Sequence, residues 1–343
     1  MKFLLLLIML ILFSANASAA SAPLIIDLYK TNQITLDQIL KKHKKHFQKI
    51  ADIISSSQEI NSDKNQKTLL KTTEKIISNI KKMGDFYYVN LSPVIYPNNK
   101  TVYITIDIVD QNDEKRKIKF LDQPQKTIPD PDHLISTWDE YQKIGFDLYI
   151  KNKIPSQVKS CPAYHCTFGF NDSALKKYQT LFATFVPKNK LQLVQILKSD
   201  KDENKRATAA FLLAHLKNGE EIIKILTPSI YDPSNGVRNN VMRVLAETFS
   251  KVNNPHFKIK YAIAALSFPA ASDRNKALYM ISELVDHARY ANYVHLRAKN
   301  ELLEELKLSQ LNVHGLAYEI LKKISGKDFG DRDYLSWEQW LKK

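Results

Sequence analysis

Two stretches in the C-terminal half of the chain, DKDENKRATAAFLLAHL (200–216) and DPSNGVRNNVMRVLAETF (232–249), share one pattern. In both, an aspartate opens a polar turn, an arginine follows, and small and apolar residues then recur at helical spacing. The stretches SDRNKALYMISEL (272–284) and NVHGLAYEILKKI (312–324) repeat the apolar part of this pattern. Corresponding positions follow one another at intervals of 32, 36 and 40 residues, as in Ala209, Val241, Ala277 and Ala317.

A helical unit of this length cannot bury its apolar face alone, so successive units stack into a continuous core. The repeats therefore predict an all-α superhelical solenoid of helix pairs over residues 188–343. Its end, ISGKDFGDRDYLSWEQWLKK (324–343), carries Trp337 and Trp340 on a short final helix, which is typical of a terminal cap. Stacking of a carbohydrate on these two tryptophans is the alternative interpretation.

The first two units resemble HEAT repeats, and the tail resembles that of exported bacterial HEAT-repeat proteins. In this family, aspartate and arginine side chains form a ladder between neighbouring repeats. The resemblance implies a structural ladder here, with His314 in place of the arginine in the fourth unit, which puts that rung in doubt. The residues that match the ladder are Asp200, Asp202, Arg206, Asp232, Arg238 and Arg274.

Residues 24–120 predict a small α+β domain. LIIDLY (24–29) is an apolar run typical of a strand, and Thr35 can cap the amphipathic helix that follows. His43 falls on the apolar face of that helix and is interpreted as a core residue, whereas His46 borders its lysine-rich face.

A second amphipathic helix ends at Gly84, and the period of the apolar residues then changes to two. The segment KKMGDFYYVNLSPVIYPNNKTVYITIDIVD (81–110) resembles the second half of a POTRA domain, and LYKTNQITLDQIL (28–40) resembles its opening strand, turn and helix. The POTRA-like resemblance covers residues 24–110, although Thr31 stands where the family has glycine. It implies binding of a peptide strand at the sheet edge.

The segment LDQPQKTIPDPDH (121–133) is rich in proline and polar residues, and it predicts a linker over residues 121–131. A helical connector over residues 132–187 follows, with Asp132 as the cap of its first helix. The fold predicted for the whole chain is a small α+β domain followed by an all-α solenoid, mostly α overall.

The chain opens with Lys2, an apolar run over residues 3–13 and small residues up to Ala19. This is the layout of a secretory signal peptide, which we expect over residues 1–19. No later stretch is apolar and long enough to cross a bilayer. The sequence therefore predicts export, to the periplasm or the outside of the cell.

The only two cysteines, Cys161 and Cys166, lie in SCPAYHCTFGF (160–170) with His165 between them. Because an exported protein meets an oxidising compartment, we expect a structural disulfide. A zinc site on these three side chains is the alternative, and it would need a fourth ligand from elsewhere.

The net charge of +14 comes mainly from an excess of lysine over arginine. Arginine is the residue that nucleic-acid recognition prefers, so the sequence favours an acidic protein or an anionic envelope surface as the partner over a nucleic acid. No metalloprotease, hydrolase or P-loop motif occurs, and no cofactor is expected.

We therefore predict an exported, non-enzymatic scaffold for protein–protein interaction, built on HEAT-like repeats. One alternative is an envelope enzyme or enzyme accessory subunit, with a site near Asp130, Asp132, His133 and the cysteine loop. The other is a secreted factor that acts on a host protein.

Overall fold

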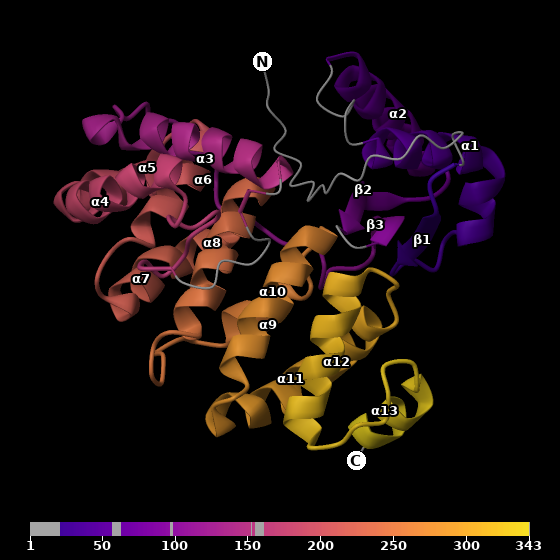
Figure 1. The fold of residues 1–343 in the computed structure, drawn as a ribbon. Coiled ribbons are helices and arrows are strands. Elements are labelled where there is room, and N and C mark those ends of the chain that lie inside the picture. The colour runs from indigo at the N-terminus through magenta and orange to yellow at the C-terminus, as the bar shows by residue number, and fades with distance from the viewer. Residues whose placement is uncertain (1–20, 57–62, 97–98, 152, 155–160, 343) are drawn as a thin grey trace.

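The computed structural model describes residues 21–56, 63–96, 99–151, 153–154 and 161–342 (Figure 1). The expected leader, residues 1–19, lies outside the described residues. A small mixed sheet with two helices comes first and is followed by helices alone, which confirms the predicted fold class.

The N-terminal part contains three strands and two helices in the order β-α-α-β-β. The sheet has the strand order β1-β3-β2, and β1 is parallel to β3 whereas β2 is antiparallel to it. Thr35 caps the first helix in a capping box, because it exchanges two hydrogen bonds with Gln38. The bounds are β1 (Leu24–Tyr29), α1 (Leu36–Ser55), α2 (Asp63–Lys81), β2 (Phe86–Tyr96) and β3 (Asn99–Asp110).

The central strand β3 is buried on both faces of the sheet. Ile104, Ile106 and Ile108 pack in one core with apolar residues of α1 and α2. The alternating residues Thr105 and Asp107 are equally buried, and Asp107 accepts a hydrogen bond from the first residue of a repeat helix. Because side chains alternate across a strand, the sheet is a middle layer between α1–α2 and the repeats.

The helical part consists of a connector, stacked pairs and a final short helix. Each pair packs internally, and the second helices α6, α8, α10 and α12 contact one another in succession, so one core runs from α3 to α13 (Figure 1). The bounds are α3 (Leu134–Ile150), α4 (Ser173–Lys188), α5 (Lys190–Ser199), α6 (Glu203–Leu213), α7 (Gly219–Leu226), α8 (Asn235–Phe249), α9 (Lys260–Ala265), α10 (Ala271–Leu284), α11 (Ala288–Leu306), α12 (Leu311–Ser325) and α13 (Tyr334–Leu341), with 3₁₀ helices at Pro131–His133 and Thr227–Tyr231.

Residues 117–130, which we term the strap, connect the sheet to α3 in an extended conformation. The backbone N–H of Leu121 donates to the carbonyl of Tyr231 at 2.8 Å. Lys126 bridges the turn before α6, where it accepts a hydrogen bond of 2.7 Å from the N–H of Lys201. The predicted linker is therefore fastened along the turns of the repeats, and it runs from the later units back to the first.

The start of α3 differs from the prediction. Asp132 and His133 have left-handed φ angles of 46° and 58°, and they turn the chain so that Asp130 lies at the helix end. The Asp130 carboxylate accepts hydrogen bonds from the N–H groups of Ile135 at 2.8 Å and Ser136 at 3.0 Å. The prediction that Asp132 caps this helix was wrong, since its carboxylate accepts from the Asn189 amide instead.

Candidate functional site

The arginines of the repeats lie at the starts of α6, α8 and α10, and each binds across to the next unit. The Arg206 guanidinium donates two hydrogen bonds to Asp232, at 2.9 and 2.8 Å. Arg238 binds Asp273 in the same way, with a shortest distance of 2.7 Å. Each guanidinium also donates to a carbonyl at the start of its own turn, which joins successive turns into a ladder.

The third rung departs from this scheme, because Arg274 has two acidic partners. Its Nε donates to Glu305 of α11 at 2.7 Å, and its Nη2 donates to Asp107 of β3 at 2.9 Å. The guanidinium lies over the ring of Tyr29, 3.7 Å from the centroid. We call these four residues the joint, because they connect the sheet to the repeats.

The joint is fully buried and highly charged. Burial by itself would lower the pKa of Arg274, but Glu305 and Asp107 outweigh it and raise that pKa above its usual value. Two further contacts fasten the sheet: Asp27 accepts from the N–H of Ser309, and the Tyr96 hydroxyl accepts from the N–H of Asn312. The sheet is therefore held against the ends of α10 and α12.

The remaining ladder residues have local roles. Asp200 accepts the N–H of Ile128 from the strap at 2.8 Å and pairs with Lys205. Asp202 caps α6 by accepting from the N–H of Asn204. In the fourth unit, His314 contacts the Leu306 carbonyl through Nδ1, and its Nε2 lies 3.0 Å from Asp331 in the cap.

The cysteine loop is closed by a disulfide between Cys161 and Cys166, whose Cα atoms are 5.7 Å apart. Between them, His165 is buried and stacks on Phe211 with 4.7 Å between ring centroids. Its Nδ1 lies 2.9 Å from a carboxylate oxygen of Glu247 on α8. Because both sulfurs are in the disulfide, neither is available as a thiolate ligand for zinc.

The residues of the alternative enzyme site lie at two different parts of α3. Asp130, Asp132 and His133 are at its start, whereas the cysteine loop packs near its middle, where Gln142 donates to Thr167 at 3.0 Å. The eight steps from Leu134 to Gln142 span about 12 Å of helix. Asp130 and Asp132 are also engaged in capping and in holding Asn189.

The two cap tryptophans differ in exposure. Trp337 is completely buried, and its indole N–H donates to the Gly330 carbonyl at 2.9 Å. Trp340 is half-buried and stacks on His295 with 4.7 Å between ring centroids. With one ring in the core and the other stacked, the pair does not form an open platform for a sugar.

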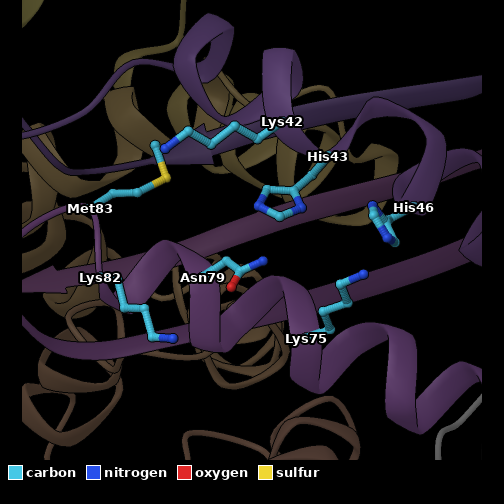
Figure 2. A pocket seen from close by; sticks show the side chains of 7 residues that line it. All are labelled: Lys42, His43, His46, Lys75, Asn79, Lys82 and Met83. Carbon is cyan, nitrogen blue, oxygen red and sulfur yellow. The ribbon is translucent and has the colours of Figure 1, made fainter.

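A pocket lies between α1 and α2, on the side of the sheet away from the repeats (Figure 2). Its volume is about 450 Å³, and every polar group in its wall is a cation, an imidazole or an amide. Figure 2 shows His43 and Asn79 reaching toward one another from the two helices. The lining residues are Lys42, His43, His46, Lys75, Asn79, Lys82 and Met83.

His43 is the most unusual of these residues. It is only 3% exposed, yet both of its ring nitrogens lack a hydrogen-bond partner, as does Nδ1 of His46. Burial lowers the pKa of His43, and the neighbouring His46, Lys42 and Lys75 lower it further. A buried polar group without a partner costs stability, so two such nitrogens beside a cavity indicate a place for a ligand.

The sequence interpretation of His43 as a core residue accounts for its burial but missed the pocket. The signal is present in both helices: His43 and His46 are three residues apart on α1, and Lys75 and Asn79 are four apart on α2, with Lys82 directly after its end. These spacings place each set on one face of its helix. Which faces meet depends on how α1 and α2 pack, and the pattern of one helix cannot give that.

Within the described parts of the chain, no cluster of three or more histidine, cysteine, aspartate or glutamate side chains is arranged to hold a metal ion. Among the same residues, no helix combines the length and apolar character needed to span a membrane. Comparison of the chain with protein-family models, with curated proteins and with solved structures found no match.

Proposed function

We propose that this protein is an exported, non-enzymatic interaction scaffold whose α1–α2 layer binds an acidic surface of a protein partner. The observation that carries the proposal is the unbalanced charge of this layer. Helices α1 and α2 contain ten lysines and four acidic residues, so their net charge is 10 − 4 = +6. None of the ion pairs between described residues involves a lysine of either helix.

Unpaired surface lysines favour association with an acidic partner by steering the encounter and by selecting against basic surfaces. The repeats support this role because the joint and the strap hold the sheet, and with it α1 and α2, at a fixed place on the stacked helices. Because the α1–α2 layer is held in one position, less conformational entropy is lost when a partner binds.

Two features support export. The first 19 residues have the pattern of a secretory leader, and the disulfide between Cys161 and Cys166 suits an oxidising compartment. Fractionation of cells and medium after expression with the native leader tests this part. Recovery of the protein in the cytoplasm with its leader intact would contradict it, and recovery in the medium would favour a factor that acts outside the cell.

The partner is tested by crosslinking in the native envelope, identification of the captured protein and titration of that protein in purified form. Lys41 and Lys45 are exposed on α1 and do not line the pocket, so Lys41→Glu with Lys45→Glu reverses charge on the outer surface alone. We expect affinity to fall about tenfold or more for this variant. Lys198→Glu with Lys201→Glu, on exposed positions of the first repeat, is the matched control.

Equal loss of affinity in both variants would show that only the overall charge of the protein matters. Unchanged affinity in the α1 variant would place the binding surface elsewhere. Either result contradicts the proposed role of the α1–α2 layer.

A further inference from the structure

We propose that the pocket between α1 and α2 is a binding site for a phosphate group. Its wall offers hydrogen-bond donors from two helices: ammonium groups of Lys42, Lys75 and Lys82, imidazoles of His43 and His46, and the amide of Asn79 (Figure 2). Among the described residues, no carboxylate lines it. A concentration of donors and positive charge without an acidic partner is complementary to an anion.

The buried imidazole distinguishes this pocket from an ordinary lysine-rich surface. Surface lysines are solvated and gain little from a fixed partner. His43, in contrast, is almost fully buried with both ring nitrogens unpartnered, and it lies in the pocket wall opposite Asn79. An oxyanion in the pocket would accept a hydrogen bond from this ring and would offset the repulsion among the cations around it.

The number of donors favours phosphate over a carboxylate. A carboxylate has two oxygens to share among six donor side chains, whereas a phosphate group offers three or four in a tetrahedral arrangement that donors can approach from two facing helices. The volume of about 450 Å³ exceeds that of the bare anion and leaves room for the molecule that carries it. A free phosphate ester and a phospholipid headgroup both present this chemistry.

The charges around His43 also give the site a dependence on pH. Besides burial, the groups that lower its pKa are His46 and Lys42 of α1 and Lys75 of α2, and none of them is acidic. Because this pKa is lowered, the ring is mostly neutral near neutral pH. Acidification adds a positive charge to the pocket, so anion binding should become tighter as the pH falls.

The site is independent of the proposed protein partner, because it uses residues inside the pocket and not the outer lysines Lys41 and Lys45. Failure of one proposal therefore leaves the other standing. Loss of Lys75 and Lys82 should weaken phosphate binding, whereas loss of Lys41 and Lys45 should weaken protein binding and leave phosphate binding unchanged.

The test is calorimetric titration of the full-length mature protein with inorganic phosphate and glycerol phosphate, and cosedimentation with phosphatidylglycerol vesicles. Lys75→Gln with Lys82→Gln removes two exposed cations of the pocket without disturbing the core. We expect about tenfold weaker binding of phosphate in this variant. Lys41→Gln with Lys45→Gln is the control of equal charge, and it should bind as the unaltered protein does.

Sulfate serves as the probe of pH, because its charge is constant where that of phosphate changes. Its affinity should rise about fivefold as the pH falls from about 7.5 to about 5.5, and NMR should show a higher pKa of His43 when sulfate is present. A protein that binds the vesicles but not free phosphate would indicate a lipid headgroup as the ligand. A protein that binds free phosphate or glycerol phosphate but not the vesicles would indicate a soluble ester. Three results would overturn the proposal: no binding of either phosphate or vesicles, acetate binding as tight as that of phosphate, or an equal loss of phosphate affinity in the control variant.

Discussion

At Arg274, one guanidinium pairs with two buried carboxylates that come from different parts of the fold, Asp107 and Glu305. A salt bridge of this kind need not be better than an apolar replacement of the whole group. Removal of only one member is different, because it leaves buried charge without compensation. The importance of Arg274 therefore lies in the buried carboxylates that its removal would leave unpaired, more than in the net energy of its salt bridges.

We expect Arg274→Gln to lower the free energy of unfolding by about 3–5 kcal/mol, because both carboxylates would stay buried without the cation that pairs with them. Unfolding in urea, followed by tryptophan fluorescence, measures this. Arg332→Gln is the matched control: Arg332 is exposed and pairs with Asp331, so its loss should cost about 1 kcal/mol or less. A small and equal effect of both substitutions would contradict the importance of the joint.

His215 gives the protein a sensitivity to acid. It is buried among aromatic rings, including Trp138 and Phe182, and this burial lowers its pKa to about 3. The unfolded chain binds a proton near the ordinary histidine pKa of about 6.5, so the unfolded state takes up more protons below that pH. Stability is therefore present at neutral pH and is lost as the pH falls.

Between about pH 7 and about pH 5, this one residue should remove about 2 kcal/mol from the free energy of unfolding. Urea unfolding at the two pH values measures the loss, and His215→Gln, which cannot titrate in this range, should reduce it by that amount. The same pH dependence in both proteins would show that His215 is not its source.

For single residues, the sequence indicates a binding partner where both residues belong to neighbouring repeat units. Arg206 and Arg238 can be recognised because they recur at corresponding positions, each six residues after an aspartate, Asp200 or Asp232. Asp273, the partner of Arg238, stands directly before Arg274 and breaks this spacing. Asp107 could not be recognised as a partner of Arg274, because 167 residues separate them and Asp107 is hidden in an alternating strand.

At the scale of elements, the disulfide loop and α3 act together. The loop packs against α3, where the Tyr141 hydroxyl donates to the Gly169 carbonyl and accepts from the N–H of Phe168. The disulfide limits the conformations that the loop can adopt in the unfolded chain, and His165 fixes the loop against α8.

We expect the mature protein to weigh two hydrogens less than its reduced form in intact-mass spectrometry. The double variant Cys161→Ser and Cys166→Ser should lose about 2 kcal/mol of unfolding free energy, because the closed loop is short. Reduction of the unaltered protein should have the same effect, and addition of reductant to the double variant should have none. A reductant effect on the double variant would point to another cause.

The strap shows the limit of composition as a guide to elements. Proline and polar residues predict a linker over residues 121–131, but the same composition does not separate a free tether from a docked segment. The difference lies in specific contacts of the strap. The N–H of Ile128 donates to Asp200, and the centroid of the Phe120 ring lies 3.9 Å from the guanidinium carbon of Arg238. These contacts depend on where the repeats present their turns.

For the molecule as a whole, the sheet and the repeats should unfold together. Tyr29 of β1 belongs to the same core as the repeat helices, and Asp107 connects β3 to α10. We expect one calorimetric transition whose measured enthalpy equals the van't Hoff enthalpy. Two separate transitions in the unaltered protein would contradict this expectation.

Asp107→Asn should weaken the connection and separate the transition into two steps, because the neutral amide binds Arg274 less strongly. Asp122→Asn, in an exposed part of the strap, is the control and should leave a single transition.

Of the whole molecule, the sequence predicted the two kinds of structure and their order. It did not predict that they share a core, because that depends on contacts between residues far apart in the chain.

The path of the strap has a consequence for biogenesis. A chain is synthesised from its N-terminus, so the sheet and the strap are made before the repeats on which they pack. The sheet is therefore made early, while the helices that cover its second face, α10 and α12, are made late. Until α10 and α12 have been synthesised, the face of the sheet that bears Asp107 is uncovered. A chain truncated before α10 should therefore be prone to aggregation and to removal by proteases.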